Sequence, residues 1–342
     1  MTPSRTYSRP FIALIIVLII CFFGNISLGS VQIPFQDVFN SLIGNSDHES
    51  WQYIIQNYRL PKAFTAILVG SGLGISGLLM QTLFRNPLAG PFVLGISSGA
   101  SLGVALVILG SGLFGGVLAS VLISKWTVVI AASVGSFLVL LAVMIVSSRV
   151  RDTMAILIIG LMFGSITAAV VSVLSYFSSA EQLQQYIFWG FGSLGNLSWN
   201  ELLIFFVIYC FGILMTITSI KALNTFLLGE NYAKSLGLNI KQSRFIIIIA
   251  TSLLAGTITA FAGPIAFIGL AIPHMTRQIF NTSNHKILLP AVFLFGAIVM
   301  LICDSIAQLP TSDYTLPINA ITSLIGAPVV IWLLVRQRKM IF

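Results

Sequence analysis

The sequence has few charged residues. Asp, Glu, Lys and Arg make up 8% of its 342 residues, whereas 57% are hydrophobic, and the mean hydropathy is +1.02. That balance excludes a water-soluble domain of this length. Because one membrane-spanning helix uses about 20 apolar residues, the chain has room for roughly ten spans with short connections. We therefore expect an all-α polytopic membrane protein that forms a single transmembrane domain over residues 1–342.

Residues that support several common chemistries are also scarce. The three cysteines each lie inside an apolar run without a close partner, which excludes a disulfide framework and a cysteine metal site. No Gly-Lys pair occurs, so the chain has no P-loop with which to hydrolyse ATP. The histidines His48, His274 and His285 fall in loops or at helix ends and have no set of metal-ligand partners. We expect neither a metal nor another cofactor.

Long uncharged stretches predict ten spans. The first stretch is too long for a secretory signal, so we interpret it as an uncleaved helix. The segment from Pro264 to Phe280 is broken by Pro273 and is counted as an irregular span. The predicted spans are Phe11–Leu28, Ala63–Phe84, Phe92–Leu109, Thr127–Ser148, Thr153–Tyr176, Leu202–Ile220, Phe245–Ala262, Pro264–Phe280, Ile287–Cys303 and Tyr314–Val335.

Basic residues are distributed unevenly over the connections. Alternating the loops places 14 of the 17 Lys and Arg residues on the side of both tails, and only Arg59, Lys62 and Lys125 on the other. The positive-inside rule assigns the basic side to the cytoplasm, so both termini are expected there. The net charge of +8 then reflects membrane topology and gives no reason to expect nucleic acid as a partner.

A stripe of small side chains is predicted on the fifth span. Gly160, Gly164, Ala168 and Ser172 recur every four residues and therefore lie on one helix face. Such a stripe lets helices approach closely, or leaves room for a solute. Helix packing and a pathway-facing role both remain open at this point.

Prolines and glycines interrupt several helices. Pro87 and Pro91 end the helix between spans two and three, and Gly263-Pro264 and Ile272-Pro273 interrupt the chain near span eight. Backbone groups freed by such breaks must be satisfied by protein or by water in a cavity. Broken helices favour a transporter, with a purely structural kink as the alternative.

The largest cytoplasmic loop, residues 221–244, contains a short amphipathic segment. Tyr232, Ala233 and Leu236 are predicted to share one face of a helix that Gly237 ends. An apolar face on the cytoplasmic surface either lies on the bilayer or enters a groove of a partner protein. The residues alone favour neither interpretation.

Carboxylates and histidines are almost absent from the predicted spans. Asp304 lies near the outer end of the ninth span. Ion-coupled transporters usually carry carboxylates or histidines at mid-membrane depth, so ion coupling is disfavoured. The run Gly95-Ile96-Ser97-Ser98-Gly99 fits the G-x-S-x-G nucleophile motif, but no strand is predicted before it and no histidine lies deep in another span. Catalysis is therefore disfavoured too.

Taken together, these segments resemble the FecCD-type permeases, the membrane subunits of ABC importers for iron-siderophores, haem and vitamin B12. The resemblance covers nearly the whole chain, and the order and spacing of its motifs make it specific. The matching segments are Arg59-Leu60-Pro61-Lys62, Gly77-Leu78-Leu79-Met80-Gln81, Arg85-Asn86-Pro87-Leu88-Ala89, Leu94-Gly95-Ile96-Ser97-Ser98-Gly99-Ala100, Leu228-Gly229-Glu230 with Leu236-Gly237, Gly263-Pro264-Ile265-Ala266-Phe267-Ile268-Gly269-Leu270, Pro273-His274-Met275-Thr276-Arg277 and Gly326-Ala327-Pro328.

The resemblance implies a type II ABC importer permease fold with ten helices per subunit, in a bacterial inner membrane. Two permease subunits, identical or paralogous, would enclose the pathway, with two cytoplasmic ATPase subunits and an extracytoplasmic substrate-binding protein. In the family, the helix matching this loop docks into a cleft of the ATPase, which favours the partner interpretation. The implied coupling residues are Leu228, Gly229, Glu230, Ala233, Leu236 and Gly237.

The resemblance also implies an outer docking site and a gate. Arg59 and Lys62 match positions that pair with acidic residues of the binding protein, and snorkelling at the start of the second span is the alternative. Many relatives carry a third arginine where this chain has Gln308, so docking here rests on fewer charge pairs or on a differently charged partner. The cytoplasmic gate of the family maps onto Thr153 and Met154.

We therefore expect a permease subunit that imports an iron-siderophore or a similar iron chelate, driven by ATP hydrolysis on a partner. Vitamin B12 and haem are the alternative cargoes. An ion-coupled secondary transporter is the alternative from another class, and an intramembrane protease is a more remote one. Selection of the cargo falls mainly to the binding protein, so the permease sequence does not specify it.

Overall fold

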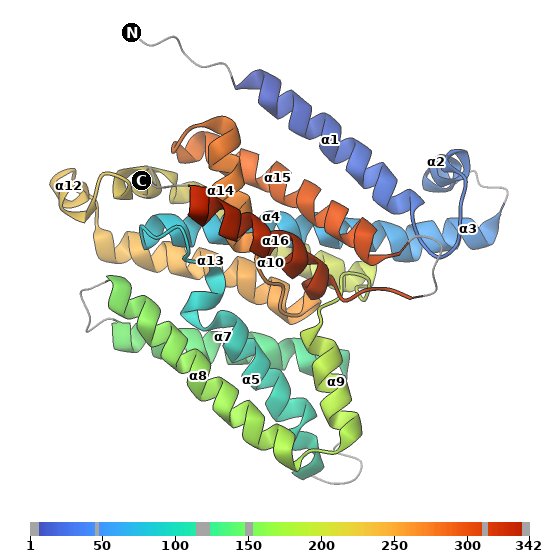
Figure 1. Ribbon diagram of the computed structural model, residues 1–342, viewed down its shortest axis with the longest axis horizontal. Helices are drawn as coiled ribbons and strands as arrows, with labels where there is room; N and C mark the ends of the chain where they lie inside the picture. Colours follow the sequence, from blue (N-terminus) through green and yellow to red (C-terminus); the bar gives the residue numbers. More distant parts are fainter. Residues whose placement is uncertain (1–6, 45–47, 114–123, 148–152, 310–313, 337–342) are drawn as a thin grey trace. The chain divides into compact units, whose positions relative to one another are not determined.

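The computed structural model describes residues 7–44, 48–113, 124–147, 153–309 and 314–336, and every regular element in these ranges is a helix (Figure 1). The chain divides into two compact units, each discontinuous in sequence. Unit 1 comprises residues 1–78, 194–206 and 266–342, and unit 2 comprises residues 79–193 and 207–265. A single domain over residues 1–342 stays a prediction.

Each of the ten predicted spans corresponds to a helix. Among the described residues, seven helices are long and apolar enough to cross a membrane, and Ile96–Ile108 and Ile318–Trp332 are shorter apolar helices. The irregular span corresponds to the 13-residue helix α14 (Ile268–Phe280). The all-helical prediction is confirmed, but several boundaries were wrong, two of them as follows. The second span begins well before Ala63, since Glu49–Leu83 is continuously helical, and the third begins with the 3-10 turn η2 (Pro91–Leu94).

Unit 1 is built around α15 (His285–Ala307), which packs against α1 (Ser8–Ser27), α14 and α16 (Ile318–Arg336). Close helix contacts in this unit depend on glycine. Gly70 of α4 (Leu60–Leu83) lies against the backbone of Gly296 in α15, and neither position has room for a Cβ. The remaining elements of the unit are α2 (Phe35–Ile43), α3 (Glu49–Ile54) and the π-helical turn η1 (Ile55–Arg59).

The predicted break at Gly263-Pro264 is present, whereas α14 continues through Pro273, so the interruption predicted at that residue was wrong. The chain itself satisfies the backbone of the break. Ile268 donates its N–H to the carbonyl of Ala266 (2.8 Å), which closes a tight turn around Phe267. Phe267 has a φ of 65°, an uncommon conformation for a residue with a side chain. The N–H of Ala266 donates to Oδ1 of Asn319 in α16 (3.0 Å). A side chain therefore takes the role that water would otherwise have at this break.

Unit 2 contains α5 (Ile96–Ile108), α7 (Lys125–Ser147) and α8 (Thr153–Phe177) side by side (Figure 1), with α13 (Ile240–Ala262) packed against α5 and α7. Small residues such as Ala100, Ala132 and Ala260 fill its core, which lets these helices pack closely. The unit also holds η2, η3 (Gly110–Leu113), α9 (Ala180–Gly190), most of α10 (Trp199–Thr218), α11 (Ile220–Phe226) and α12 (Glu230–Ser235).

Candidate functional site

Helix α12 is a short helix in the loop between α11 and α13. Gly229, which precedes it, has a φ of 101°, a value that residues with a Cβ rarely adopt. At the other end, the N–H of Gly237 donates to the carbonyl of Lys234 (2.9 Å), and that of Leu238 donates to the carbonyl of Ala233 (3.0 Å). This is the Schellman arrangement. Gly237 ends the helix as predicted, and the two glycines fix the limits of α12.

The apolar residues of this segment do not share one face, so that prediction was wrong. Ala233 is fully buried, whereas Leu228, Tyr232 and Leu236 are 62%, 54% and 60% exposed. The helix has only six residues, and Leu236 is its C-cap, where helical spacing no longer sets the direction of a side chain. Ala233 therefore anchors the segment, while three large apolar side chains remain exposed.

A hollow of about 660 Å³ lies beside α12, entirely within unit 2. Residues 228–232 and Ser235 form most of its lining, and Arg85 contributes from the turn that follows α4. The segment thus combines projecting apolar side chains with a concave and partly polar surface. Protein docking sites combine the same two features.

Glu230 is held to α13 by an ion pair. Its Oε1 lies 2.6 Å from Nη2 of Arg244, which is near the start of α13. Both side chains are partly exposed, so the pair adds about 1 kcal/mol or less to stability. Its main effect is geometric, because it fixes α12 against a helix that packs on α5 and α7. Sequence reasoning missed Arg244, since the pairing depends on the reversal of the chain at Gly237.

Arg59 is buried at the end of η1. Its Nη1 donates to the carbonyls of Ile26 (2.9 Å) and Ser27 (3.0 Å), and its Nη2 donates to the carbonyl of Val31. These carbonyls belong to the end of α1 and to the residues after it, where a helix leaves its carbonyls without intrahelical partners. Arg59 therefore caps α1, and its charge complements the helix dipole.

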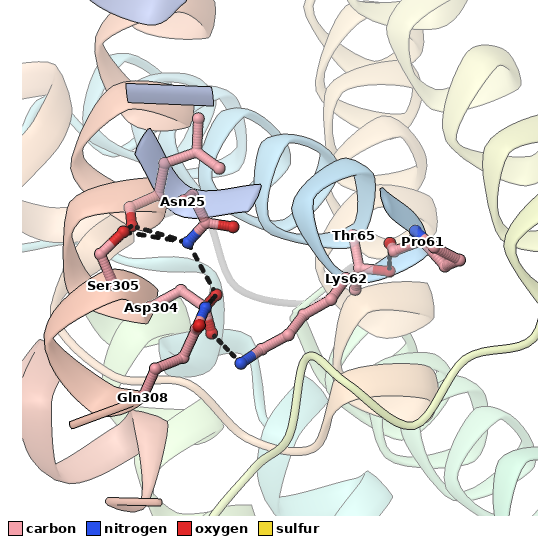
Figure 2. Close-up of polar contacts among 8 residues, drawn as sticks. Asn25, Pro61, Lys62, Thr65, Asp304, Ser305 and Gln308 are labelled. Carbon is pink, nitrogen blue, oxygen red and sulfur yellow. Dashed lines mark hydrogen bonds and ion pairs between the residues drawn. The ribbon is translucent and has the colours of Figure 1, made fainter. Parts of the chain in front are cut away.

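Lys62 belongs to a polar cluster that joins α1, α4 and α15 (Figure 2). Its Nζ lies 3.1 Å from Oδ1 of Asp304, a side chain that is only 3% exposed. The other carboxylate oxygen, Oδ2, accepts from Nδ2 of Asn25 (2.9 Å) and from Nε2 of Gln308 (2.8 Å). Asn25 also donates to Oγ of Ser305 (3.0 Å). Both oxygens of the buried carboxylate thus have partners, as a buried charge requires.

A cavity of about 350 Å³ adjoins this cluster, and Arg59, Lys62 and Gln308 contribute to its lining. The structure therefore brings together the two cations predicted for docking, but each has partners within the chain. Asn25 and Asp304 were not predicted as those partners. The signal that could have found them was Asp304 itself, because a carboxylate within a span needs a partner. A docking role for Arg59 and Lys62 stays a prediction.

The predicted small-residue stripe of α8 is divided. Gly160 is buried against the carbonyl of Val93 with no room for a Cβ, so it serves helix packing. Gly164 is half-buried near Oγ of Ser98, whereas Ala168 and Ser172 are exposed. The side chains of the predicted gate, Thr153 and Met154, lie outside the described part of the structure. A pathway role for these residues stays a prediction.

The family model for the FecCD transport family matches residues 17–336. The chain belongs to this family. Among its relatives, the hemin transport system permease protein HmuU of Yersinia pestis is 33% identical over 327 residues, or 95% of each chain. The vitamin B12 import system permease protein BtuC of Klebsiella pneumoniae is 38% identical over 291 residues, or 84% of each chain.

Solved structures agree with this membership. A protein assigned as a metal-chelate type ABC transporter, in an inward-facing conformation, matches with a TM-score of 0.83 and 31% identity over 97% of this chain and 100% of that chain. PsaBC from Streptococcus pneumoniae, in complex with Fab, matches with a TM-score of 0.53 and 15% identity over 88% of this chain and 97% of that chain, which supports the fold alone.

Membership in the FecCD family confirms the resemblance and the predicted fold class. It places the chain among membrane transport proteins rather than enzymes. Together with the apolar helices, it indicates a multi-pass protein of a bacterial inner membrane. The side on which the termini of this FecCD protein lie stays a prediction.

The polar cluster predicts energetic coupling between Lys62 and Asp304. Lys62→Met leaves the carboxylate without its cation, and Asp304→Asn leaves the cation without its anion. We expect each replacement to lower the stability of this FecCD protein by about 1–3 kcal/mol, and the double replacement to cost less than the sum. Thermal unfolding of the purified protein in detergent measures all three variants. Additive losses would show that the two groups do not interact.

The ion pair of Glu230 and Arg244 predicts that Arg244→Met loosens α12 without unfolding α13. Amide hydrogen exchange over residues 230–238 should become about twofold to fivefold faster, as expected when a partly exposed pair is lost. Lys241→Met is the control, because Lys241 is an exposed cation one turn earlier in α13. Equal exchange in wild type and Arg244→Met would contradict a bracing role.

Proposed function

We propose that the chain is the permease subunit of a binding-protein-dependent ABC importer that carries an iron-siderophore, or a similar iron chelate, across the bacterial inner membrane. The observation that carries the proposal is the segment around α12, in which Leu228, Tyr232 and Leu236 project beside a hollow. Such a surface suits a separate ATPase subunit. The chain itself has no P-loop, so the ATP must be hydrolysed by a partner.

Coupling in this proposal runs through α12 as a lever. When two ATPase subunits close on ATP, they displace α12, and the pair of Glu230 and Arg244 passes this displacement to α13. Because α13 packs on α5 and α7, the movement reaches the helix group of unit 2. ATP binding thus supplies the driving force for transport. In an ion-coupled transporter this force would act through carboxylates or histidines, which are almost absent from the predicted spans. The conformation of α12 is fixed by Gly229, Ala233 and Gly237.

The remaining parts of the assembly follow the family pattern. A second permease subunit, identical or paralogous, completes the pathway, and residues 1–342 act as one permease domain with both termini and residues 221–244 in the cytoplasm. On α8, the exposed Ala168 and Ser172 are suited to face the pathway, and Gly160 and Gly164 to support the helix from its packed side. Thr153 and Met154, at the start of α8, form the proposed gate.

The extracytoplasmic binding protein is proposed to dock over the cavity lined by Arg59, Lys62 and Gln308. Arg59 supports this surface from within the protein, because its guanidinium N–H groups already donate to carbonyls at the end of α1. Lys62 is 22% exposed and carries the charge that an acidic docking residue can reach. Gln308 adds a polar group without charge, so Lys62 dominates the electrostatic part of docking.

Relatives support the class of cargo. HmuU is named for hemin, and the structural match is assigned to the metal-chelate type. Both favour a chelated metal as the cargo of this chain. BtuC is named for vitamin B12, which makes a cobalt-containing cofactor the second candidate, alongside haem. The chelate that the cognate binding protein captures in a ligand-binding assay decides among the three.

Transport by this mechanism predicts that vesicles containing the permease, its ATPase and its binding protein accumulate chelated iron only with ATP. Glu230→Lys should abolish this uptake, because it reverses one charge of the pair with Arg244. Leu236→Asp should do the same by placing a charge on the docking surface. The swap Glu230→Lys with Arg244→Glu should recover part of the uptake. Radiolabelled iron retained by the vesicles measures each variant.

Two outcomes would count against the proposal in different ways. Accumulation by the permease alone on an ion gradient would establish a secondary transporter instead. Normal ATP-driven uptake in both single variants would keep the importer but remove α12 as its lever. Correct membrane insertion, checked by protease protection, shows that a loss of uptake is not a loss of folding.

The docking proposal predicts that Lys62→Gln weakens binding of the binding protein about threefold to tenfold at low salt. The difference should shrink as salt rises, because a single charge is screened. Lys125→Gln serves as the control, since Lys125 lies on the same predicted side but does not line the cavity. Identical affinities for Lys62→Gln and wild type at low salt would remove Lys62 from the docking surface.

A further inference from the structure

We propose that the turn at residues 85–89 is a second docking element for the ATPase subunit, and that Arg85 receives a carboxylate of that subunit. The inference rests on the proposed function, because it needs an ATPase at the surface around α12. It goes beyond that function in naming a second element and the chemistry of the group that meets it. The family resemblance assigned coupling to residues 228–237 and gave Arg85 no role.

The turn is rigid because its backbone is held at several points. The N–H of Arg85 donates to the carbonyl of Thr82 (3.3 Å), and that of Asn86 donates to the carbonyl of Gln81 (3.1 Å). Together they form a Schellman arrangement at the end of α4. Oδ1 of Asn86 accepts from the N–H of Leu88 (2.9 Å), which fixes the next residues as well. The side chain of Arg85 therefore projects from a backbone that hydrogen bonds hold in one conformation.

Arg85 occupies the position of this arrangement that normally favours glycine. Its φ of 47° is in the left-handed region, where a residue with a Cβ is disfavoured. The second helix end of this kind in unit 2, after α12, has Gly237 at the same position. Backbone strain of this sort is concentrated at functional sites, where the side chain has a use that offsets it. The polar group that arginine adds over glycine at this position is the guanidinium.

The guanidinium of Arg85 is exposed and lies at the hollow beside α12. Its Nη1 is close to Gly229, 3.7 Å from where a Cβ on that glycine would lie. Arg85 has no ion pair or side-chain hydrogen bond with any residue that the structure describes. By contrast, the carboxylate of Glu230 is already paired with Arg244. Among the described residues, Arg85 therefore brings to the hollow a positive charge without an ion-pair partner.

A partner that fits this hollow must be convex and carry a carboxylate among apolar groups. The charge of Arg85 calls for an anion, and the exposed side chains of Leu228 and Tyr232, which line the hollow, call for apolar contact. A protruding Asp or Glu of a protein surface can enter this hollow of about 660 Å³ and reach the guanidinium. The ATPase subunit that docks on α12 is placed to supply one.

The experiment measures the affinity of the full-length permease for its cognate ATPase subunit, in detergent, at low and at high salt. Arg85→Glu should weaken binding at low salt by about tenfold, and the loss should shrink at high salt. Lys241→Glu is the matched control, because it makes the same charge change at an exposed position that does not line the hollow. Its affinity should equal that of wild type.

Arg85→Gly separates docking from folding. Glycine suits the left-handed backbone at this position, so the melting temperature should stay the same or rise. The affinity for the ATPase should nevertheless fall about threefold to tenfold. In Arg85→Lys, a carbodiimide should join the new amine to an Asp or Glu of the ATPase, and mass spectrometry would identify that residue.

Three results decide the matter. Wild-type affinity in both Arg85→Gly and Arg85→Glu, with Glu230→Lys still blocking uptake, would overturn this inference and leave the importer standing. No ATPase binding by wild type would overturn the proposed function itself. Loss of phosphatidylglycerol binding to detergent-solubilised Arg85→Glu, with ATPase affinity unchanged, would overturn the inference in favour of a lipid phosphate.

Discussion

Backbone groups within a membrane protein need partners from the chain, because hydrocarbon offers none, and much of this structure follows from that constraint. The end of α1 is closed by the guanidinium of Arg59, which takes three carbonyls. The break before α14 is closed by Asn319. Each of these polar side chains ties together elements that are distant in the sequence. Arg59 and Asn319 therefore have structural roles in this apolar chain.

The two ion pairs show how burial changes the role of a charge. Asp304 is enclosed, and Lys62, Asn25 and Gln308 together satisfy both of its oxygens. Removing any of these groups leaves an uncompensated polar atom, so the cluster holds three helices in register. Glu230 and Arg244 are partly exposed, and their pair contributes orientation rather than much stability. A weak but directional link suits the lever role proposed for α12.

The apolar stretches predicted the helices well, because a span must be long, uncharged and hydrogen-bonded within itself. Local backbone chemistry also predicted the end of α12, since Gly237 readily adopts the left-handed conformation of a C-cap. Side-chain direction was predicted less well. Tyr232 and Ala233 were assigned to one face, yet a helix of six residues leaves Ala233 inside and Tyr232 outside. Gly160 packs against the carbonyl of Val93, while its role in the pathway stays a prediction.

By itself, the sequence determined that this protein is a bundle of membrane helices without a P-loop, and the order of its motifs determined its family. These properties depend on local composition and on spacing along the chain. Only the tertiary structure decided that Arg59 caps a helix, that Lys62 faces Asp304 and that Arg85, beside Gly229, has no ion-pair partner among the described residues. Whether a charge is satisfied depends on residues brought together from distant helices, and neither composition nor spacing records that proximity.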